Sequence, residues 1–163
     1  MTPTPEQYID QFHKQALRTV RIVRLFEDRD LALCPGEGSM STAGQFQHIC
    51  GCHNFVRGVL EDKTVTNELF KKPFDVSSVA AAVRSLGAAI GEVQRAARSV
   101  TPQMWAERIS PFGPDWEMSR GEMCWLMIDH EVHHRGQLTV YARIAGKTPG
   151  MLYSPVDEGV LHL

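Results

Sequence analysis

Three histidines lie within five residues of one stretch of the chain, at positions 130, 133 and 134. Residues four apart on a helix lie on the same face, close enough for two imidazoles to bind the same ion. His130 and His134 have this spacing. His133, three residues from His130, is the alternative to His134 as the second ligand. The spacing therefore predicts two metal ligands on one helix.

A helix over residues 119–146 would carry these histidines. Ser119 and Glu122 have the spacing of a capping box, in which the two side chains satisfy free backbone amides of the first turn. Gly146 suits the far end of the helix. The face that carries His130 and His134 is otherwise apolar, as on a helix that faces a core. A single buried histidine most often only hydrogen-bonds to its neighbours, but a pair at this spacing favours a bound ion.

The residues from 130 to 134, His-Glu-Val-His-His, also match the H-E-x-x-H signature of zinc peptidases. In that signature the two histidines bind the metal and the glutamate, here Glu131, acts as the base. The extended form, with G-x-x-H to follow, is absent from this sequence. A carboxylate ligand could only be Glu158, in a tail that contains proline and glycine. A zinc peptidase is therefore the weaker alternative.

Two stretches resemble the DinB/YfiT-like family, whose members are four-helix bundles with a three-histidine metal site. The family's last helix and tail are similar to HHRGQLTVYARIAGKTPGMLYSP, and the segment along its second helix is similar to CPGEGSMSTAGQFQHICGCHNF. The resemblance implies one ligand from the second helix and two, four residues apart, from the last. These would be His48, His130 and His134, with His134 favoured over His133.

Two other residues near His48 lie on the same predicted helix. Cys52 follows His48 by four residues, and a histidine and a cysteine at this spacing can together bind zinc. The family site uses histidines only, so the resemblance implies that Cys52 is a small buried cysteine and not a ligand. His53 is predicted to have a structural role.

The remaining pattern predicts an all-α fold with a single domain over residues 1–163. Helices are predicted over residues 5–28, 42–61, 79–100 and 119–146. Thr42 and Gln45 have the spacing of a capping box for the second helix. The connection over 62–75 is longer than a tight turn, and a short extra turn is expected at 101–102. The prediction is a four-helix bundle with longer crossover connections and a metal site between facing helices.

Composition and charge argue against several classes of protein. Of the 163 residues, 43% are hydrophobic and 22% charged, with a net charge of −2. No basic block or stripe is present, which argues against nucleic-acid binding. No apolar run approaches the roughly 18 residues of a membrane span, and the first residues lack the pattern of a secretory signal. The protein is expected in the cytoplasm, with its four cysteines as thiols.

A site of three neutral imidazoles has recognisable chemistry. Such ligands leave a divalent ion its full charge and at least one open position, as in catalytic sites. Zinc, nickel and iron all suit imidazole, so the metal's identity stays open. The resemblance implies an enzyme that acts on a small molecule, either by hydrolysis or by transfer of a low-molecular-weight thiol. The alternative is a non-catalytic stress or binding protein that keeps the metal for stability.

The resemblance also implies assembly into a homodimer through helices of the bundle. The first and third predicted helices carry many apolar positions. We expect these to cover a core and to leave a self-complementary patch for a two-fold contact.

Overall fold

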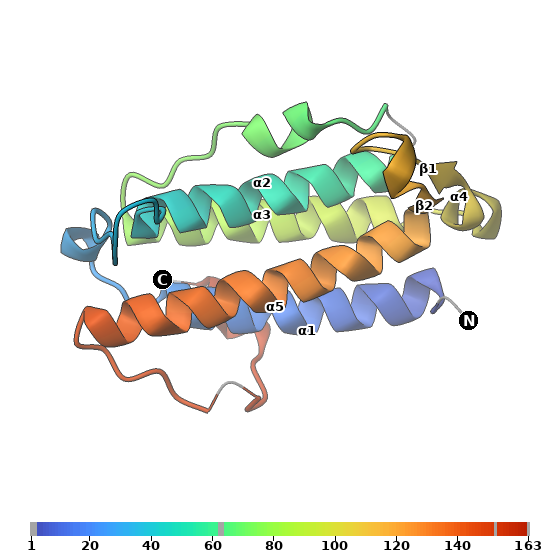
Figure 1. Ribbon diagram of the computed structural model, residues 1–163. Helices are drawn as coiled ribbons and strands as arrows, with labels where there is room; N and C mark the ends of the chain where they lie inside the picture. Colours follow the sequence, from blue (N-terminus) through green and yellow to red (C-terminus); the bar gives the residue numbers. More distant parts are fainter. Residues whose placement is uncertain (1–2, 62–63, 152, 163) are drawn as a thin grey trace.

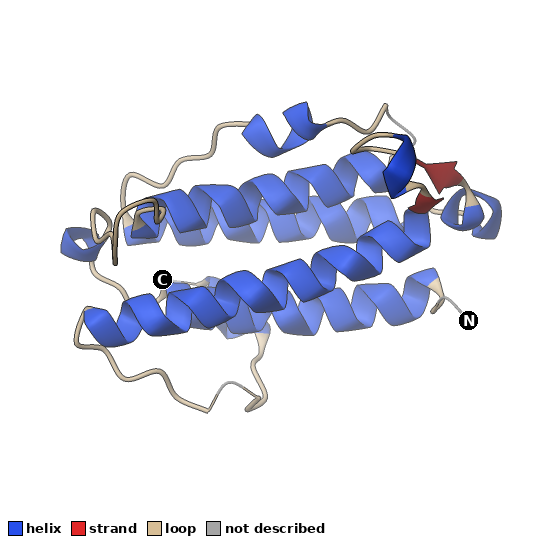
Figure 2. Ribbon diagram, in the orientation of Figure 1, coloured by secondary structure: helices blue, strands red, loops and turns tan. Residues whose placement is uncertain are grey.

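Four long helices form the body of the protein in the computed structural model, which describes residues 3–61, 64–151 and 153–162 (Figure 1). They are α1 (Pro5–Val23), α2 (Thr42–Leu60), α3 (Val79–Arg98) and α5 (Arg120–Ile144). The short elements are η1 (Asp28–Asp30), η2 (Asn67–Lys71), α4 (Pro102–Ala106), β1 (Arg108–Ile109), η3 (Pro114–Trp116), β2 (Met118–Ser119) and η4 (Glu158–Leu161). Helix dominates the described chain (Figure 2), and the predicted all-α four-helix bundle is confirmed.

The segments between the long helices match the expected connections with two differences: α1 ends at Val23, before the predicted end near residue 28, and a pair of short strands is added. Helix α4 is the short turn predicted after Thr101, whose side chain caps it. Strands β1 and β2 pair antiparallel directly before α5. Two-residue strands leave no periodic pattern in a sequence, so this pair was not predicted.

The connection between α2 and α3 makes these neighbouring helices parallel. Residues 64–78 return along the length of α2, so that α3 begins at the same end of the bundle as α2 (Figure 1). Helices α1 and α5 run in the opposite direction. Helix α2 packs on α3 and α5, and α1 packs on the same two helices. The expected crossover is confirmed, and α2 and α5 are antiparallel neighbours.

Side-chain and glycine caps delimit α5 as predicted. The hydroxyl of Ser119 accepts a hydrogen bond from the amide of Glu122, and the Glu122 carboxylate accepts one from the amide of Ser119. Gly146 follows the helix with a φ of 75°, in the left-handed region that glycine adopts without strain. Local chemistry therefore sets both ends of the helix that carries the histidine pair.

The cap of α2 differs from the prediction by one residue. The hydroxyl of Ser41 caps this helix by accepting a hydrogen bond from the amide of Gly44 at 3.0 Å. The predicted capping box of Thr42 and Gln45 is wrong, because Thr42 is already the first helical residue and the side chain of Gln45 reaches across to α5. A polar side chain committed to another helix is not available for its own helix end.

A glycine on α2 lets the segment that contains η2 lie directly on the helix. A Cβ atom at Gly51 would stand 2.4 Å from the carbonyl oxygen of Phe70, closer than two such atoms can approach. Asn54 Nδ2 donates to the carbonyl of Leu69 at 2.7 Å, and Gln47 makes two more hydrogen bonds to the backbone of this segment, both of 2.8 Å. The crossover is therefore a fixed layer on α2.

Exposed large apolar residues on the long helices lie on α5: Leu126, Val132, Val140 and Ile144. In the described parts of α1 and α3 no large apolar side chain is exposed. The large apolar side chains of those two helices therefore serve the core, and the homodimer stays a prediction. None of the described helices is long and apolar enough to span a membrane.

We expect Gly51→Ala to lower the free energy of unfolding by about 1–3 kcal/mol, because the methyl group must push the η2 segment off α2. The matched control is Gly136→Ala, since an added Cβ there meets no atom within 4 Å on the exposed side of α5. It should raise the free energy of unfolding by about 0.5–1 kcal/mol. Urea unfolding followed by circular dichroism measures both. A Gly51→Ala protein as stable as the parent would contradict the close contact.

Candidate metal centre

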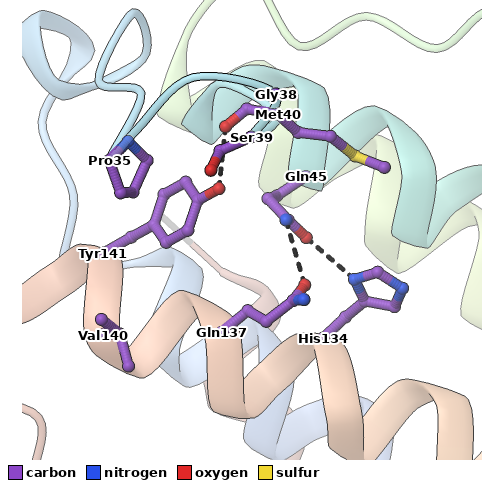
Figure 3. A pocket seen from close by; sticks show the side chains of 9 residues that line it. All are labelled: Pro35, Gly38, Ser39, Met40, Gln45, His134, Gln137, Val140 and Tyr141. Carbon is purple, nitrogen blue, oxygen red and sulfur yellow. Dashed lines mark hydrogen bonds between the residues drawn. The ribbon is translucent and has the colours of Figure 1, made fainter.

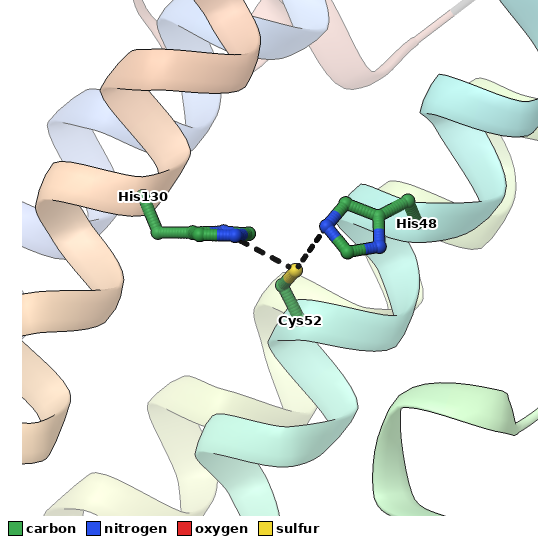
Figure 4. Close-up of side chains that lie close together, drawn as sticks. All are labelled: His48, Cys52 and His130. Atoms are coloured by element: carbon green, nitrogen blue, oxygen red, sulfur yellow. Dashed lines mark hydrogen bonds between the residues drawn. The ribbon is translucent and has the colours of Figure 1, made fainter. Parts of the chain in front are cut away.

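Helices α2 and α5 bring together four side chains that can bind a metal. His48 and Cys52 project from α2, and His130 projects toward them from α5 (Figure 4). Cys52 Sγ lies 3.5 Å from His48 Nε2 and 3.5 Å from His130 Nδ1, and the ligand atoms of these three residues lie within 4.8 Å of one another. His134 adjoins them, with Nε2 3.3 Å from His130 Nε2 and its ring centroid 4.5 Å from that of His48. The three predicted histidines are neighbours, while their role as ligands stays a prediction.

Pairs of these atoms have the separations of two ligands on one small divalent ion. Two nitrogens bound to a tetrahedral zinc ion lie about 3.4 Å apart, and a nitrogen and a sulfur about 3.6 Å apart. The observed separations are 3.3 Å between the Nε2 atoms of His130 and His134, and 3.5 Å from Cys52 Sγ to His48 Nε2 and to His130 Nδ1. One ion can use only one nitrogen of His130, either Nε2 beside His134 or Nδ1 beside Cys52. The donor set therefore fits a transition metal such as zinc, nickel or iron.

The surroundings keep the three predicted histidines in the neutral form that binds metals. Burial lowers the pKa of His48. Burial lowers the pKa of His130, and the neighbouring His48 and His133 lower it further. Burial together with the nearby imidazoles of His130 and His48 lowers the pKa of His134 to about 4. At neutral pH each ring therefore keeps a lone pair for an ion.

A chain of amide hydrogen bonds orients His134 (Figure 3). His134 Nδ1 donates to Gln45 Oε1 at 2.9 Å, Gln45 Nε2 donates to Gln137 Oε1 at 3.1 Å, and Gln137 Nε2 donates to His133 Nε2 at 3.0 Å. In this arrangement the proton of His134 is on Nδ1 and the lone pair is on Nε2, which faces His130. The Nε2 atom of His133 is used as an acceptor, which favours His134 over His133 as a ligand.

Cys52 is buried as predicted, yet its sulfur belongs to the candidate ligand group. Burial, with the charge of Glu131 and the nearby Cys50, raises the pKa of Cys52 far above that of an ordinary thiol. Without an ion the side chain is therefore a protonated thiol, which donates a hydrogen bond to a neighbouring imidazole and is a weak ligand. Cys52 would become a strong ligand only where a bound cation displaces the proton.

Glu131, the carboxylate of the H-E-x-x-H pattern, is bonded inside the core. Its Oε2 atom accepts a hydrogen bond from His53 Nε2 at 2.8 Å, and the two side chains are only 3% and 2% exposed. The ring of His53 packs edge-on against Phe12 of α1. Burial by itself would raise the pKa of Glu131, but His53 and other polar neighbours outweigh this effect and lower it. The contact gives His53 the structural role predicted for it.

The zinc-peptidase alternative requires a glutamate beside the metal-bound water and a third ligand from later in the chain. Glu131 is instead paired with His53, as described above. Glu158, in η4, is paired with His13 of α1 at 3.2 Å. Among the described residues, neither carboxylate belongs to the candidate ligand group. The contacts of both residues therefore count against a peptidase.

Two cavities of different character adjoin the histidine cluster. One, of about 420 Å³, has a mixed lining that includes the amide of Gln137 and the ring of His134 (Figure 3). The other, of about 570 Å³, has an almost wholly apolar lining that includes Phe70 and Trp116, and it is bounded by His130. The candidate centre is therefore adjoined by one cavity suited to polar groups and one suited to apolar groups.

Several features of the centre were not predicted from the sequence. Gln45 precedes His48 by three residues, so helical spacing does put it on the same side of α2 and is a signal that could have indicated it. Phe112 and Trp116 come from the irregular segment before α5, where no periodic pattern relates them to His130. These two walls of the apolar cavity therefore had no such signal.

The fold and the site define a class of protein: a four-helix bundle with a histidine-rich candidate metal centre between its second and last long helices. A model of the DinB family matches residues 1–160. The chain therefore belongs to the DinB family, and the resemblance seen in two stretches of its sequence is confirmed.

Solved DinB-like proteins have the same fold over nearly the whole chain. One from Bacillus cereus ATCC 10987 superposes with a TM-score of 0.78 at 19% identity, and the match covers 94% of this chain and all of that one. YjoA from Bacillus subtilis gives a TM-score of 0.75 at 20% identity, covering 91% and 97% of the two chains. At these identities the likeness concerns the fold.

A shorter match in sequence is found with the uncharacterized protein YrdA of Bacillus subtilis (strain 168). The two are 42% identical over 52 residues, which is 32% of this chain. The matched part spans 30% of the length of YrdA. The similarity supports common ancestry of this part of the chain and carries no activity with it.

We expect the free energy of unfolding of chelator-treated protein to fall as the pH decreases from about 6.5 to about 4. An unfolded His134 binds a proton near pH 6.5, whereas the folded one resists protonation until about pH 4, so acid favours the unfolded chain in this window. His134→Gln should make the fall shallower. Urea unfolding at a series of pH values measures this pH dependence. Equal slopes of unfolding free energy against pH for the parent and His134→Gln would contradict the depressed pKa of His134.

Proposed function

We propose that the protein holds one divalent transition metal, zinc, nickel or iron, between α2 and α5, with His48, His130 and His134 as its ligands. The observation that carries this proposal is the cluster of neutral imidazoles, in which His130 Nε2 and His134 Nε2 are 3.3 Å apart and the other nitrogen of His134 is bonded to Gln45. Three neutral ligands leave an ion its full charge and an open position. The thiol of Cys52 is within reach as a further donor.

We propose further that the protein transfers a low-molecular-weight thiol to a small electrophilic molecule. A bound divalent ion supplies positive charge that favours the thiolate form near neutral pH. The thiol sulfur bonds to the electrophilic carbon, and the bond between that carbon and its leaving group breaks. The leaving group takes the electron pair, and the thiol proton passes to water. The mixed cavity beside His134 suits the hydrophilic thiol, and the apolar cavity beside His130 suits the electrophile.

Two observations support transfer over hydrolysis at the same centre. A transferase must hold two molecules at once, and two cavities adjoin the histidines. Hydrolysis benefits from a base that takes a proton from water, but Glu131, the carboxylate next to His130, is committed to His53. The proposal implies a cytoplasmic location, because low-molecular-weight thiols are kept reduced there.

The ligand assignment predicts a metal content close to one divalent ion per chain, measured by plasma mass spectrometry. Replacement of His48, His130 or His134 by alanine should each remove most of the metal, because a site loses a third of its protein ligands. His133→Ala and Cys52→Ser are the controls and should keep it. Loss in His133→Ala with retention in His134→Ala would reverse the assignment. Retention in His48→Ala would remove His48 from the ligand assignment.

Glu131→Gln should leave the metal content intact, because glutamine still accepts the hydrogen bond from His53 Nε2. Turnover in an assay that couples cysteine or glutathione to chlorodinitrobenzene should fall by less than about tenfold, whereas loss of a general base costs about 10²–10⁴-fold. His134→Ala is the comparison that should abolish turnover. Peptidase activity in the parent that disappears in Glu131→Gln would overturn the proposal in favour of a protease.

A further inference from the structure

The apolar cavity beside His130 is bounded by segments that are far apart in the sequence. Its walls include one residue from η2, one from the loop before η3, one from η3 itself and three from α5: Phe70, Phe112, Trp116, Leu126, Met127 and His130. The volume of about 570 Å³ is in the range of small-molecule sites. A bicyclic aromatic molecule has a smaller volume than this cavity.

The aromatic walls are held in place by the core behind them. Phe70 and Phe112 both stack on Phe55, with ring centroids 4.3 and 5.5 Å away and interplanar angles of 15° and 14°. Phe55 itself is completely buried on α2. Trp116 stands edge-on to Phe112 at 6.0 Å and is 52% exposed, so one indole lies at the solvent edge of the cavity. Planar surfaces are therefore in place before any ligand arrives, which reduces the entropic cost of binding one.

Without a bound metal ion, the acidic group at this cavity disfavours anions. Among its described lining residues Asp129 is the acidic one, none is a lysine or an arginine, and His130 and His133 contribute two imidazoles. A carboxylate at the wall repels a negatively charged ligand. The apolar side chains offer no hydrogen bonds to a sugar or a phosphate, whose desolvation would then be uncompensated. The complement of this cavity is an uncharged, planar, apolar group.

We infer that this cavity binds the uncharged aromatic part of the substrate, with the reactive group of that substrate directed toward His130. The direction of the reactive group rests on the proposed function, whereas the class of the bound group rests on the cavity alone. The electrophile of the proposed transfer is then an aromatic or similarly planar apolar compound, and the thiol enters from the mixed cavity beside His134.

Two fluorescent probes that differ by one sulfonate test this inference: the neutral N-phenylnaphthylamine and the anionic anilinonaphthalenesulfonate. Their fluorescence rises in apolar surroundings, and both are titrated against the protein as purified and after chelator treatment, with the fold checked by circular dichroism. We expect the neutral probe to bind one site per chain. After chelation the sulfonated probe should bind at least about tenfold more weakly than the neutral probe.

Variants at exposed positions then locate the bound probe. Trp116→Ala and Leu126→Asn should each weaken binding of the neutral probe by about tenfold or more. Asp129→Asn should strengthen binding of the sulfonated probe and leave the neutral probe unchanged, since it removes the repulsion alone. Ile144→Asn is the matched control, because Ile144 is likewise exposed on α5 but does not line the cavity. The affinity of this control variant for the neutral probe should equal that of the parent.

Absence of neutral-probe binding, or unchanged affinity in both Trp116→Ala and Leu126→Asn, would overturn the inference. A second contrary result would be a parent protein that binds no probe and is a dimer by light scattering, while these two variants are monomers. The surface would then be a subunit contact. Metal content measured on the same samples separates the two proposals. Probe binding without metal sinks the proposed function alone, and metal without probe binding sinks the cavity inference alone.

Discussion

The hydrogen bond between His53 and Glu131 joins the two helices on which the candidate metal centre depends. Each partner directly follows a member of the ligand group, His53 after Cys52 on α2 and Glu131 after His130 on α5. The bond is 2.8 Å long and nearly excluded from water, so it sets the separation of the helices at this level. Leaving one charged partner of such a pair alone in the core costs about 3–5 kcal/mol. The core thereby holds the side chains of the candidate centre at their observed separations.

The same arrangement keeps the Glu131 carboxylate out of the candidate ligand group. The carboxylate of Glu131 is directed into the core, while burial keeps the neighbouring His130 neutral and Cys52 protonated. A dication bound among these groups would keep most of its charge. That charge would act on whatever occupies the two adjoining cavities. The assignment of one helix face to the core and the adjacent face to the centre follows from the 100° step between successive residues of a helix.

The parallel course of α2 and α3 has consequences for the centre as well. A chain that must return along α2 before starting α3 adds a layer to the outer side of α2, and Gly51 allows that layer to lie against the helix backbone. The layer contributes Phe70, which stacks on Phe55 and forms a wall of the apolar cavity. A bundle with a tight turn between these helices would lack that wall. The connection is therefore part of the proposed substrate site.

The sequence by itself determined the helices, the end caps of α5 and the common face of His130 and His134, because helical periodicity and capping depend on residues within a few positions of one another. The resemblance of two stretches to the DinB/YfiT-like family added His48 to the predicted site. Only the tertiary structure decided that Cys52 lies in the candidate ligand group, that Gln45 leaves its own helix end to orient His134, and that an aromatic cavity adjoins the centre. These features depend on the rotation and axial position of α2 relative to α5 and on irregular segments, which no local pattern encodes.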